Sequence, residues 1–397
     1  MNKLPDNWKE VKLGDIVDII MGQSPKSQFY NKRNEGMPFL QGSSTFGLLY
    51  PTFEVYSSNI KKIAVNGSVL MSVRAPVGDL NIANADICIG RGLCSINGKN
   101  KYLNRYIYYL LNYYKPQLMN MQKGTTFGAI TKDDILNFEV LITEDAEEQK
   151  RIASALSKVD AYLENTIKLT ESKERFKRAI TKKLLTCKEN KNVPEARFEG
   201  FEDEWETVKL DDICLINNKS LKGNTDKNYK FKYIDLTAVK KGNIDFSKDY
   251  ITFENAPTSA RRIINKNDII MATVRPYLLG HAFIDFEAKE YICSNGFAVL
   301  TANSDIEMKY IYQYLYSDDI AKQIRTRLEG STYPTIKSSA IKELKIKIPK
   351  SIKEQEKIGE FLSLLDAEID NLKKQAESIK RLKKGLMKKL MSGEIRI

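Results

Sequence analysis

EEQKRIASALSKVD, at residues 147–160, returns 206 residues later as KEQEKIGEFLSLLD, at residues 353–366. In the later copy the apolar residues follow one another at alternating spacings of four and three, which is typical of the seam of a coiled-coil helix. The seam comprises Ile358, Leu362, Leu365, Ile369, Leu372, Ala376 and Ile379, and it continues less regularly through Leu382, Leu386 and Leu390. We therefore expect a long helix at residues 352–393.

The earlier copy predicts a second long helix, at residues 144–187. Its apolar seam consists of Ile152, Leu156, Val159, Leu163, Ile180 and Leu184. Polar residues interrupt this seam at Thr166, Thr170 and Lys173. The two helices could each pack only on their own domain. However, a helix of ~42 residues is ~63 Å long and exceeds a domain of ~150 residues, which favours pairing of the two helices.

Three further pairs of segments repeat in the same order along the chain. They are NWKEVKLGDI (7–16) with EWETVKLDDI (204–213), NGSVLMSVRAP (66–76) with KNDIIMATVRP (266–276), and KGTTFGAITKDDILNFEVLI (123–142) with EGSTYPTIKSSAIKELKIKI (329–348). Because four pairs share one order, the chain consists of two copies of a unit of about 200 residues. We expect globular parts at 1–143 and 202–351, a linker at 188–201 and a short tail at 394–397.

Each globular part mixes strands and helices, so the expected fold class is α+β, with α/β-like domains and long helices. Alternating apolar residues predict strands at 69–73, 269–274 and 344–348. Dense apolar runs predict buried helices at 102–114 and 308–316. The short linker ties the end of the first long helix to the second globular part, from which the second long helix starts. We therefore expect an antiparallel two-helix coiled-coil spacer between two repeated domains, with a pseudo-twofold axis.

The composition favours an anionic partner. The chain has 63 Lys and Arg against 51 Asp and Glu, a net charge of +12 and a pI near 9.1, a balance that is frequent among nucleic-acid-binding proteins. The excess lies in residues 168–191 and 372–396, where a solvated helix face is the simpler explanation. No run of 18 apolar residues appears and the start of the sequence lacks a signal-peptide pattern, so we expect no membrane partner and a cytoplasmic location.

The sequence lacks the residues that a metal site or a nucleophilic active site needs. The five cysteines include no C-x-x-C pair, and His281 is the only histidine, so we expect no metal site, no disulfide framework and no Ser-His-Asp triad. The sequence contains no Walker phosphate loop and no Pro-Pro of an adenine methyltransferase loop. The chain is therefore expected to have no catalytic residues.

Several of the repeated segments resemble those of one known family. They are the W-x-x-V-K-L segments at Trp8 and Trp205, the linker PEARFEGFEDEWE (194–206), the G-[ST]-T-[FY]-x-x-I segments at Gly124 and Gly330, and the helix starts at Gln149 and Gln355. Over its full length the chain resembles the specificity subunit of type I restriction-modification systems. The polar interruption of the first helical seam departs from a dry coiled coil.

The resemblance implies a non-catalytic DNA reader with two target recognition domains, each for one half of a bipartite, asymmetric sequence in double-stranded DNA. It also implies that the paired helices set the distance between the half-sites and dock two modification (methyltransferase) subunits, with restriction subunits added. S-adenosylmethionine, ATP and Mg²⁺ would then belong to partner subunits, and this chain would hold no cofactor. A two-domain repeat scaffold that binds protein partners rather than DNA is the alternative, and a self-sufficient fused enzyme is a third candidate.

Polar loops and arginines at strand ends are the candidate DNA contacts, because such side chains reach base edges and phosphates. In the first globular part they are Gln41, Ser43, Ser44, Thr45, Arg74, Lys123, Thr125 and Thr126. In the second they are Lys219, Lys222, Arg261, Arg262, Arg275, Ser331, Thr332 and Tyr333. The loops could also be ordinary turns, and Arg74 and Arg275 could instead pair with internal carboxylates. We expect His281 to be a domain residue rather than a base reader.

Overall fold

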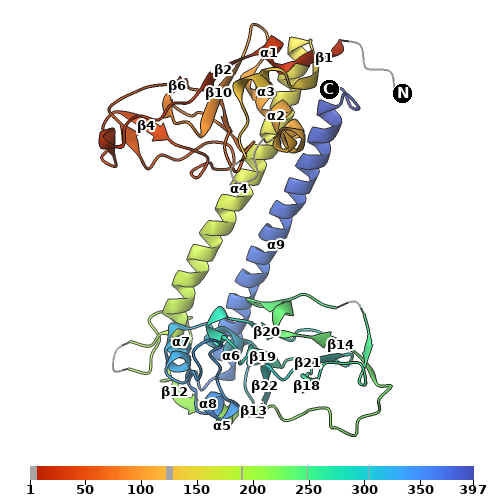
Figure 1. Cartoon of the computed structure of the whole chain (residues 1–397). Helices are drawn as coiled ribbons and strands as arrows, with labels where there is room; N and C mark the ends of the chain where they lie inside the picture. The colour runs from red at the N-terminus through yellow and green to blue at the C-terminus, as the bar shows by residue number, and fades with distance from the viewer. Residues whose placement is uncertain (1–6, 122–127, 189–190, 248, 304) are drawn as a thin grey trace. The chain divides into compact units, whose positions relative to one another are not determined.

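The computed structural model describes residues 7–121, 128–188, 191–247, 249–303 and 305–397 (Figure 1). The chain divides into two compact units: unit 1 comprises residues 1–169 with 372–397, and unit 2 comprises residues 170–371. Each unit holds one globular part, about half of helix α4 (Ala146–Leu185) and about half of helix α9 (Ile352–Met391). The expected α+β class is confirmed, with long helices added to mixed globular parts.

Unit 1 is organised around an antiparallel sheet in the order β2-β10-β7-β8. Its strands are Val17–Met21, Leu93–Gly98, Val69–Ser72 and Leu80–Ile82. Helix α2 (Asn104–Asn120) packs against this sheet and buries tyrosine and leucine side chains. The N-terminal strand β1 (Trp8–Lys12) pairs with β11 (Glu139–Thr143), the strand that leads into α4.

A second, five-stranded sheet of unit 1 carries most of the loops discussed below. Its order is β3-β5-β4-β9-β6, and β4 runs parallel to β9. The strands are Tyr30–Asn31, Tyr56–Ser57, Met37–Leu40, Ile87–Ile89 and Ile63–Ala64. Leu40, Ile87 and Ile89 are buried in the small core beneath it.

Unit 2 repeats the same plan. Strand β12 (Glu206–Lys209) pairs with β23 (Lys345–Ile348), which leads into α9. The main sheet has the order β13-β22-β19-β20, with strands Cys214–Ile216, Phe297–Ala302, Ile269–Ala272 and His281–Phe283. A second four-stranded sheet has the order β17-β14-β21-β18, with strands Ile251–Thr252, Lys230–Ile234, Tyr291–Ser294 and Ala260–Ile263. Unit 2 also contains a two-stranded ribbon of β15 (Val239–Lys240) and β16 (Asn243–Ile244), and the helices α6 (Met308–Tyr314) and α7 (Asp318–Arg325).

Each unit has a buried tryptophan and a buried glutamate that are joined by an arginine in the same arrangement. In unit 1, Trp8 donates from Nε1 to Glu148 at 3.3 Å, and Arg396 of the C-terminal tail donates to the same carboxylate at 2.9 Å. In unit 2, Trp205 donates to Glu354 at 3.3 Å, and Arg197 of the linker donates to it at 2.8 Å. Both glutamates are 1% exposed, so each depends on its arginine for neutralisation.

The two long helices pack against each other in antiparallel sense within each unit. In unit 1, Leu163 of α4 packs with Ala376 and Ile379 of α9. In unit 2, Leu184 lies in one core with Ile358 and Leu362. The apolar seam thus forms where the 4-3 spacing predicts it.

The expected continuation of the seam through Leu382 is wrong, because this side chain is 71% exposed. The 4-3 spacing from Ile379 leads instead to Lys383, whose ammonium pairs with Asp160 of α4. In unit 2 the equivalent pair joins Lys177 of α4 to Asp366 of α9. The helices therefore keep their register through charged seam residues rather than through an unbroken apolar stripe. The polar interruption of α4 is likewise packed, since Thr166 and Thr170 are 5% and 8% exposed.

Candidate nucleic-acid interface

In unit 2 the structure brings together two segments that the sequence placed about 60 residues apart. Strand β19 ends before Arg275, whose backbone N–H donates to Pro334 O at 2.7 Å. Towards β19, Val274 forms the next bridge with Thr335, and Ile336 N donates to Thr273 O at 2.9 Å. The predicted contacts Arg275, Thr332 and Tyr333 therefore share one corner of the unit.

The guanidinium of Arg275 lies over an aromatic ring. Its carbon is 4.5 Å from the ring centroid of Tyr333, and its Nη2 donates to Thr332 O at 3.4 Å. Tyr333 is 64% exposed, and the backbone of Arg275 has a φ of 47°, a left-handed conformation that costs free energy for a side chain of this size. The contact with the tyrosine ring holds the arginine in one orientation while the residue stays partly exposed.

Unit 1 has the corresponding corner. Arg74 forms a backbone bridge with Ala129, and Ile130 N donates to Val73 O at 3.0 Å. A cleft of about 430 Å³ is lined by Arg74, Ala75, Gly128 and Ala129. Three predicted contacts of the same loop, Lys123, Thr125 and Thr126, lie outside the described residues.

Neither Arg74 nor Arg275 forms an ion pair with a carboxylate in the part of the chain that the structure describes. The alternative that these arginines neutralise internal acids therefore has no counterpart in the described geometry. Arg74 is exposed at the end of β7, as a group that contacts an external anion must be.

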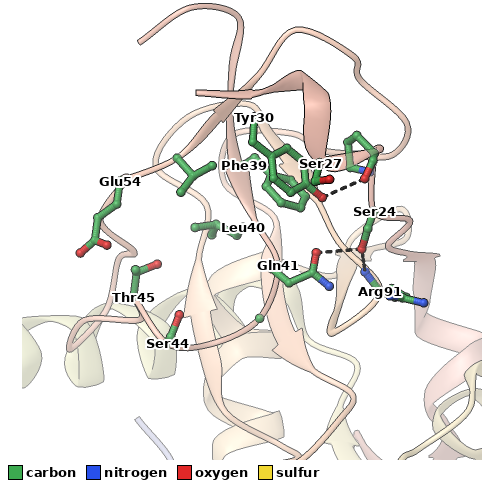
Figure 2. Close-up of a pocket in the computed structure, with 13 residues that line it drawn as sticks. Ser24, Ser27, Tyr30, Phe39, Leu40, Gln41, Ser44, Thr45, Glu54 and Arg91 are labelled. Atoms are coloured by element: carbon green, nitrogen blue, oxygen red, sulfur yellow. Dashed lines mark hydrogen bonds between the residues drawn. The ribbon is translucent and has the colours of Figure 1, made fainter. Parts of the chain in front are cut away.

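A cleft of about 540 Å³ lies beside the five-stranded sheet of unit 1 (Figure 2). Gln41, Ser44 and Thr45 line it, as do Glu54 and Arg91. Tyr30 and Phe39 stack on each other at 4.6 Å between ring centroids and form an apolar wall. The hydroxyl of Ser43 is used elsewhere, because it donates to Asp79, which also pairs with Lys115 at 2.8 Å.

Sequence reasoning missed Arg91, which borders this cleft. The signal was the segment Gly90-Arg91-Gly92, in which two glycines let the backbone turn closely around a single exposed cation. No strand or seam pattern points to it, because it lies between β9 and β10.

The predicted cations of unit 2 gather along the edge strand β18. Ser220 bridges Arg262, which donates to its Oγ at 3.0 Å, and Leu221 N donates to Arg261 O at 2.8 Å. Arg261 stacks on Phe253 at 4.6 Å. Lys219 and Lys222 are exposed beside these arginines. Predicted residues that are far apart in the sequence thus form one basic edge. Ser331 is exposed next to the Arg275 corner instead.

His281 is a core residue of the main sheet of unit 2. It is fully buried, and its ring nitrogens have no hydrogen-bond partner among the described residues. Burial lowers the pKa of His281 to about 4, so the ring is neutral at pH 7. Burial likewise raises the pKa of Cys94 and of Cys214 to about 12, so these thiols are not nucleophiles. Within the described residues no cluster of His, Cys, Asp and Glu could hold a metal ion, and no helix is long and apolar enough to cross a membrane.

Comparison with known proteins identifies a family whose profile matches this chain. The profile of the type I restriction modification DNA specificity domain matches the chain twice, at residues 5–171 and 202–381. A Methanocaldococcus jannaschii protein named as the specificity subunit of type I restriction enzyme MjaX is 42% identical over 191 residues, which are 47% of this chain and 45% of that protein. The chain therefore aligns with about half the length of this relative.

Two other similar proteins cover nearly the whole chain. The MjaVIII specificity subunit of the same organism is 23% identical over 408 residues, which span 100% of this chain and 94% of that protein. The crystal structure of the S subunit of a type I restriction-modification system from M. genitalium has a TM-score of 0.67 and 20% identity, and it covers 98% of each chain. At this identity the structural likeness shows the fold alone.

Proposed function

Because the chain belongs to the family of type I restriction-modification DNA specificity subunits, we propose that it recognises a bipartite, asymmetric site in double-stranded DNA. The observation that carries the proposal is the double match of a DNA specificity domain within one chain. One matched segment contains the corner that carries Arg74 and the other contains the corner that carries Arg275. Each unit would read one half of the site. The net charge of +12 suits a polyanionic partner.

The proposal gives the chain no catalytic step. Methyl transfer would be the task of modification subunits that bind S-adenosylmethionine, and cleavage would be the task of restriction subunits that use ATP and Mg²⁺. Two modification subunits would dock on the long helices. Support comes from Phe176 and Leu382, which are 52% and 71% exposed and occupy equivalent positions, 206 residues apart. Two equivalent apolar side chains outside the seam suit two copies of one partner.

The proposal is tested by expressing the chain with its cognate modification subunit and sequencing the host genome with a method that detects methylated adenine. We expect one two-part motif with a fixed spacer. Replacing residues 1–143 by the equivalent part of a relative should change one half of the motif and leave the other intact. Methyl transfer by the isolated chain, or a change in both halves, would contradict the proposal. Partner binding without any DNA motif would favour the protein scaffold instead.

A further inference from the structure

The large cleft of unit 1 contains a hydrogen-bond chain with a fixed direction. The backbone N–H of Arg91 can only donate, and it donates to Ser24 Oγ at 3.2 Å. The one hydroxyl proton of Ser24 is therefore directed to Gln41 Oε1, which lies 2.8 Å away. This arrangement turns the carboxamide oxygen of Gln41 towards Ser24, as Figure 2 shows, and leaves Nε2 as the exposed end of the amide.

The backbone on both sides of Gln41 is held just as closely. Gly90 N donates to Leu40 O at 2.8 Å, and Gly92 N donates to Gln41 O at 3.2 Å. A Cβ atom at Gly90 would lie 2.7 Å from Gln41 Oε1, and one at Gly92 would lie 2.5 Å from Gln41 O. Only glycine fits at these two positions, so the turn that presents Arg91 also packs directly on Gln41.

Several other polar groups that line the cleft have no hydrogen-bond partner among the described residues. They include Gln41 Nε2 and the guanidinium of Arg91, which can only donate, and the buried Thr45 Oγ1. Among the described residues Glu54 is the only carboxylate that lines the cleft, and Figure 2 shows it on the side opposite Arg91. The Gln41 side of the cleft thus offers N–H groups to a ligand that presents acceptors.

We propose that Gln41 and Arg91 read a guanine in the half-site of unit 1, by donating to its O6 and N7 atoms in the major groove. This inference rests on the proposed function, since it requires that unit 1 binds DNA. Guanine presents two adjacent acceptors there, whereas adenine presents one acceptor and one donor and cytosine presents a donor. A glutamine that reads adenine uses its oxygen and nitrogen side by side, and here Ser24 takes the oxygen.

The test is Gln41→Glu in the full chain, co-expressed with the modification subunit. The carboxylate still accepts from Ser24 and keeps the shape of the side chain, but it replaces the free donor by an acceptor. We expect methylation of the wild-type motif to fall roughly 10- to 100-fold. The bases accepted in the methylated motif should change at one G·C pair of one half-site, and the other half-site should stay the same. Gln117→Glu, the same charge change at an exposed position of α2, is the matched control and should leave motif and rate unaltered.

A second variant tests Ser24 as the positioning residue. Ser24→Ala frees the carboxamide to turn over, so the fold and motif should persist while the guanine position comes to tolerate adenine. If the wild-type chain yields no bipartite motif, the proposed function itself fails. If it does yield one and Gln41→Glu keeps both motif and rate, or if the affected pair is A·T, the assignment of guanine is wrong. If the melting temperature shows that Gln41→Glu does not fold, unchanged specificity in Ser24→Ala overturns the inference.

Discussion

The pairs Asp160–Lys383 and Asp366–Lys177 occupy equivalent seam positions, yet they differ in burial, and this difference predicts their contributions to stability. The side chain of Asp160 is 3% exposed and that of Asp366 is 47% exposed, while both lysines are 19% exposed. Lys383→Met leaves Asp160 buried and charged, with Tyr109 Oη as its remaining donor at 2.7 Å. Removing one partner of a buried pair costs ~3–5 kcal/mol. An exposed pair contributes at most about 1 kcal/mol, so Lys177→Met should cost about that much.

The chain provides its own reporters for this comparison, because it has two tryptophans, one in the core of each unit. Urea unfolding of a Trp205→Phe background follows Trp8 and hence unit 1, and a Trp8→Phe background follows unit 2. The double variant Asp160→Asn with Lys383→Met should recover most of the loss, since a neutral amide still accepts from Tyr109. Equal losses for Lys383→Met and Lys177→Met, or a loss below about 1 kcal/mol for Lys383→Met, would refute the reasoning.

Three further predictions concern the tail, acid stability and the long helices. Arg396→Ala should destabilise unit 1 by about 1–2 kcal/mol. Burial opposes the charge of Glu148, but hydrogen bonds from Arg396 and Thr143 outweigh it and hold the pKa of Glu148 below its ordinary value. A wild-type midpoint in the urea curve of Trp8 would contradict this prediction. The pKa of His281 is lowered to about 4, so the unfolded chain takes up a proton first as the pH falls. Unit 2 should therefore lose about 1–2 kcal/mol between pH 7 and pH 5, and His281→Phe should remove the part of this loss that is due to the imidazole when Trp205 is followed at both pH values. Inserting four residues near Leu169 lengthens one helix by ~6 Å with little rotation of its seam. The non-specific DNA spacer should therefore grow by about one or two base pairs. An unchanged spacer in an active variant would show that the helices do not set the spacer length.

The long helices and the repeated units could be predicted from the sequence because both depend on periodicity, which is a local or translational property. Leu382 shows the limit of that approach. Its apolar character suggested a seam residue, but the 4-3 spacing selects Lys383, and only the position of Asp160 across the helix pair explains a lysine there. Thr166 and Thr170 are similar, since their polarity suggested a wet interruption and packing buries them.

The candidate DNA contacts also divide into those that the sequence could identify and those that only the structure could identify. Arginines at strand ends could be chosen from the sequence, but the stacking of Arg275 on Tyr333 depends on a bridge between segments about 60 residues apart. Arg91 had only the two flanking glycines as a signal, because its place beside Gln41 depends on close backbone contacts between segments about 50 residues apart. The Trp–Glu–Arg arrangement could not be predicted either, since its tryptophan and glutamate are 140 positions apart in unit 1 and 149 in unit 2.

The two units differ in when a ribosome finishes them. Unit 2 is one uninterrupted segment, residues 170–371, so all of it has been synthesised before residues 372–397 of unit 1. Unit 1 starts first but also needs residues 372–397, including Ile379 for its seam and Arg396 for Glu148. A chain released early would therefore carry a complete unit 2 beside a unit 1 whose glutamate is unneutralised and whose α4 seam is uncovered. Completion of unit 1 thus requires translation at least as far as Arg396.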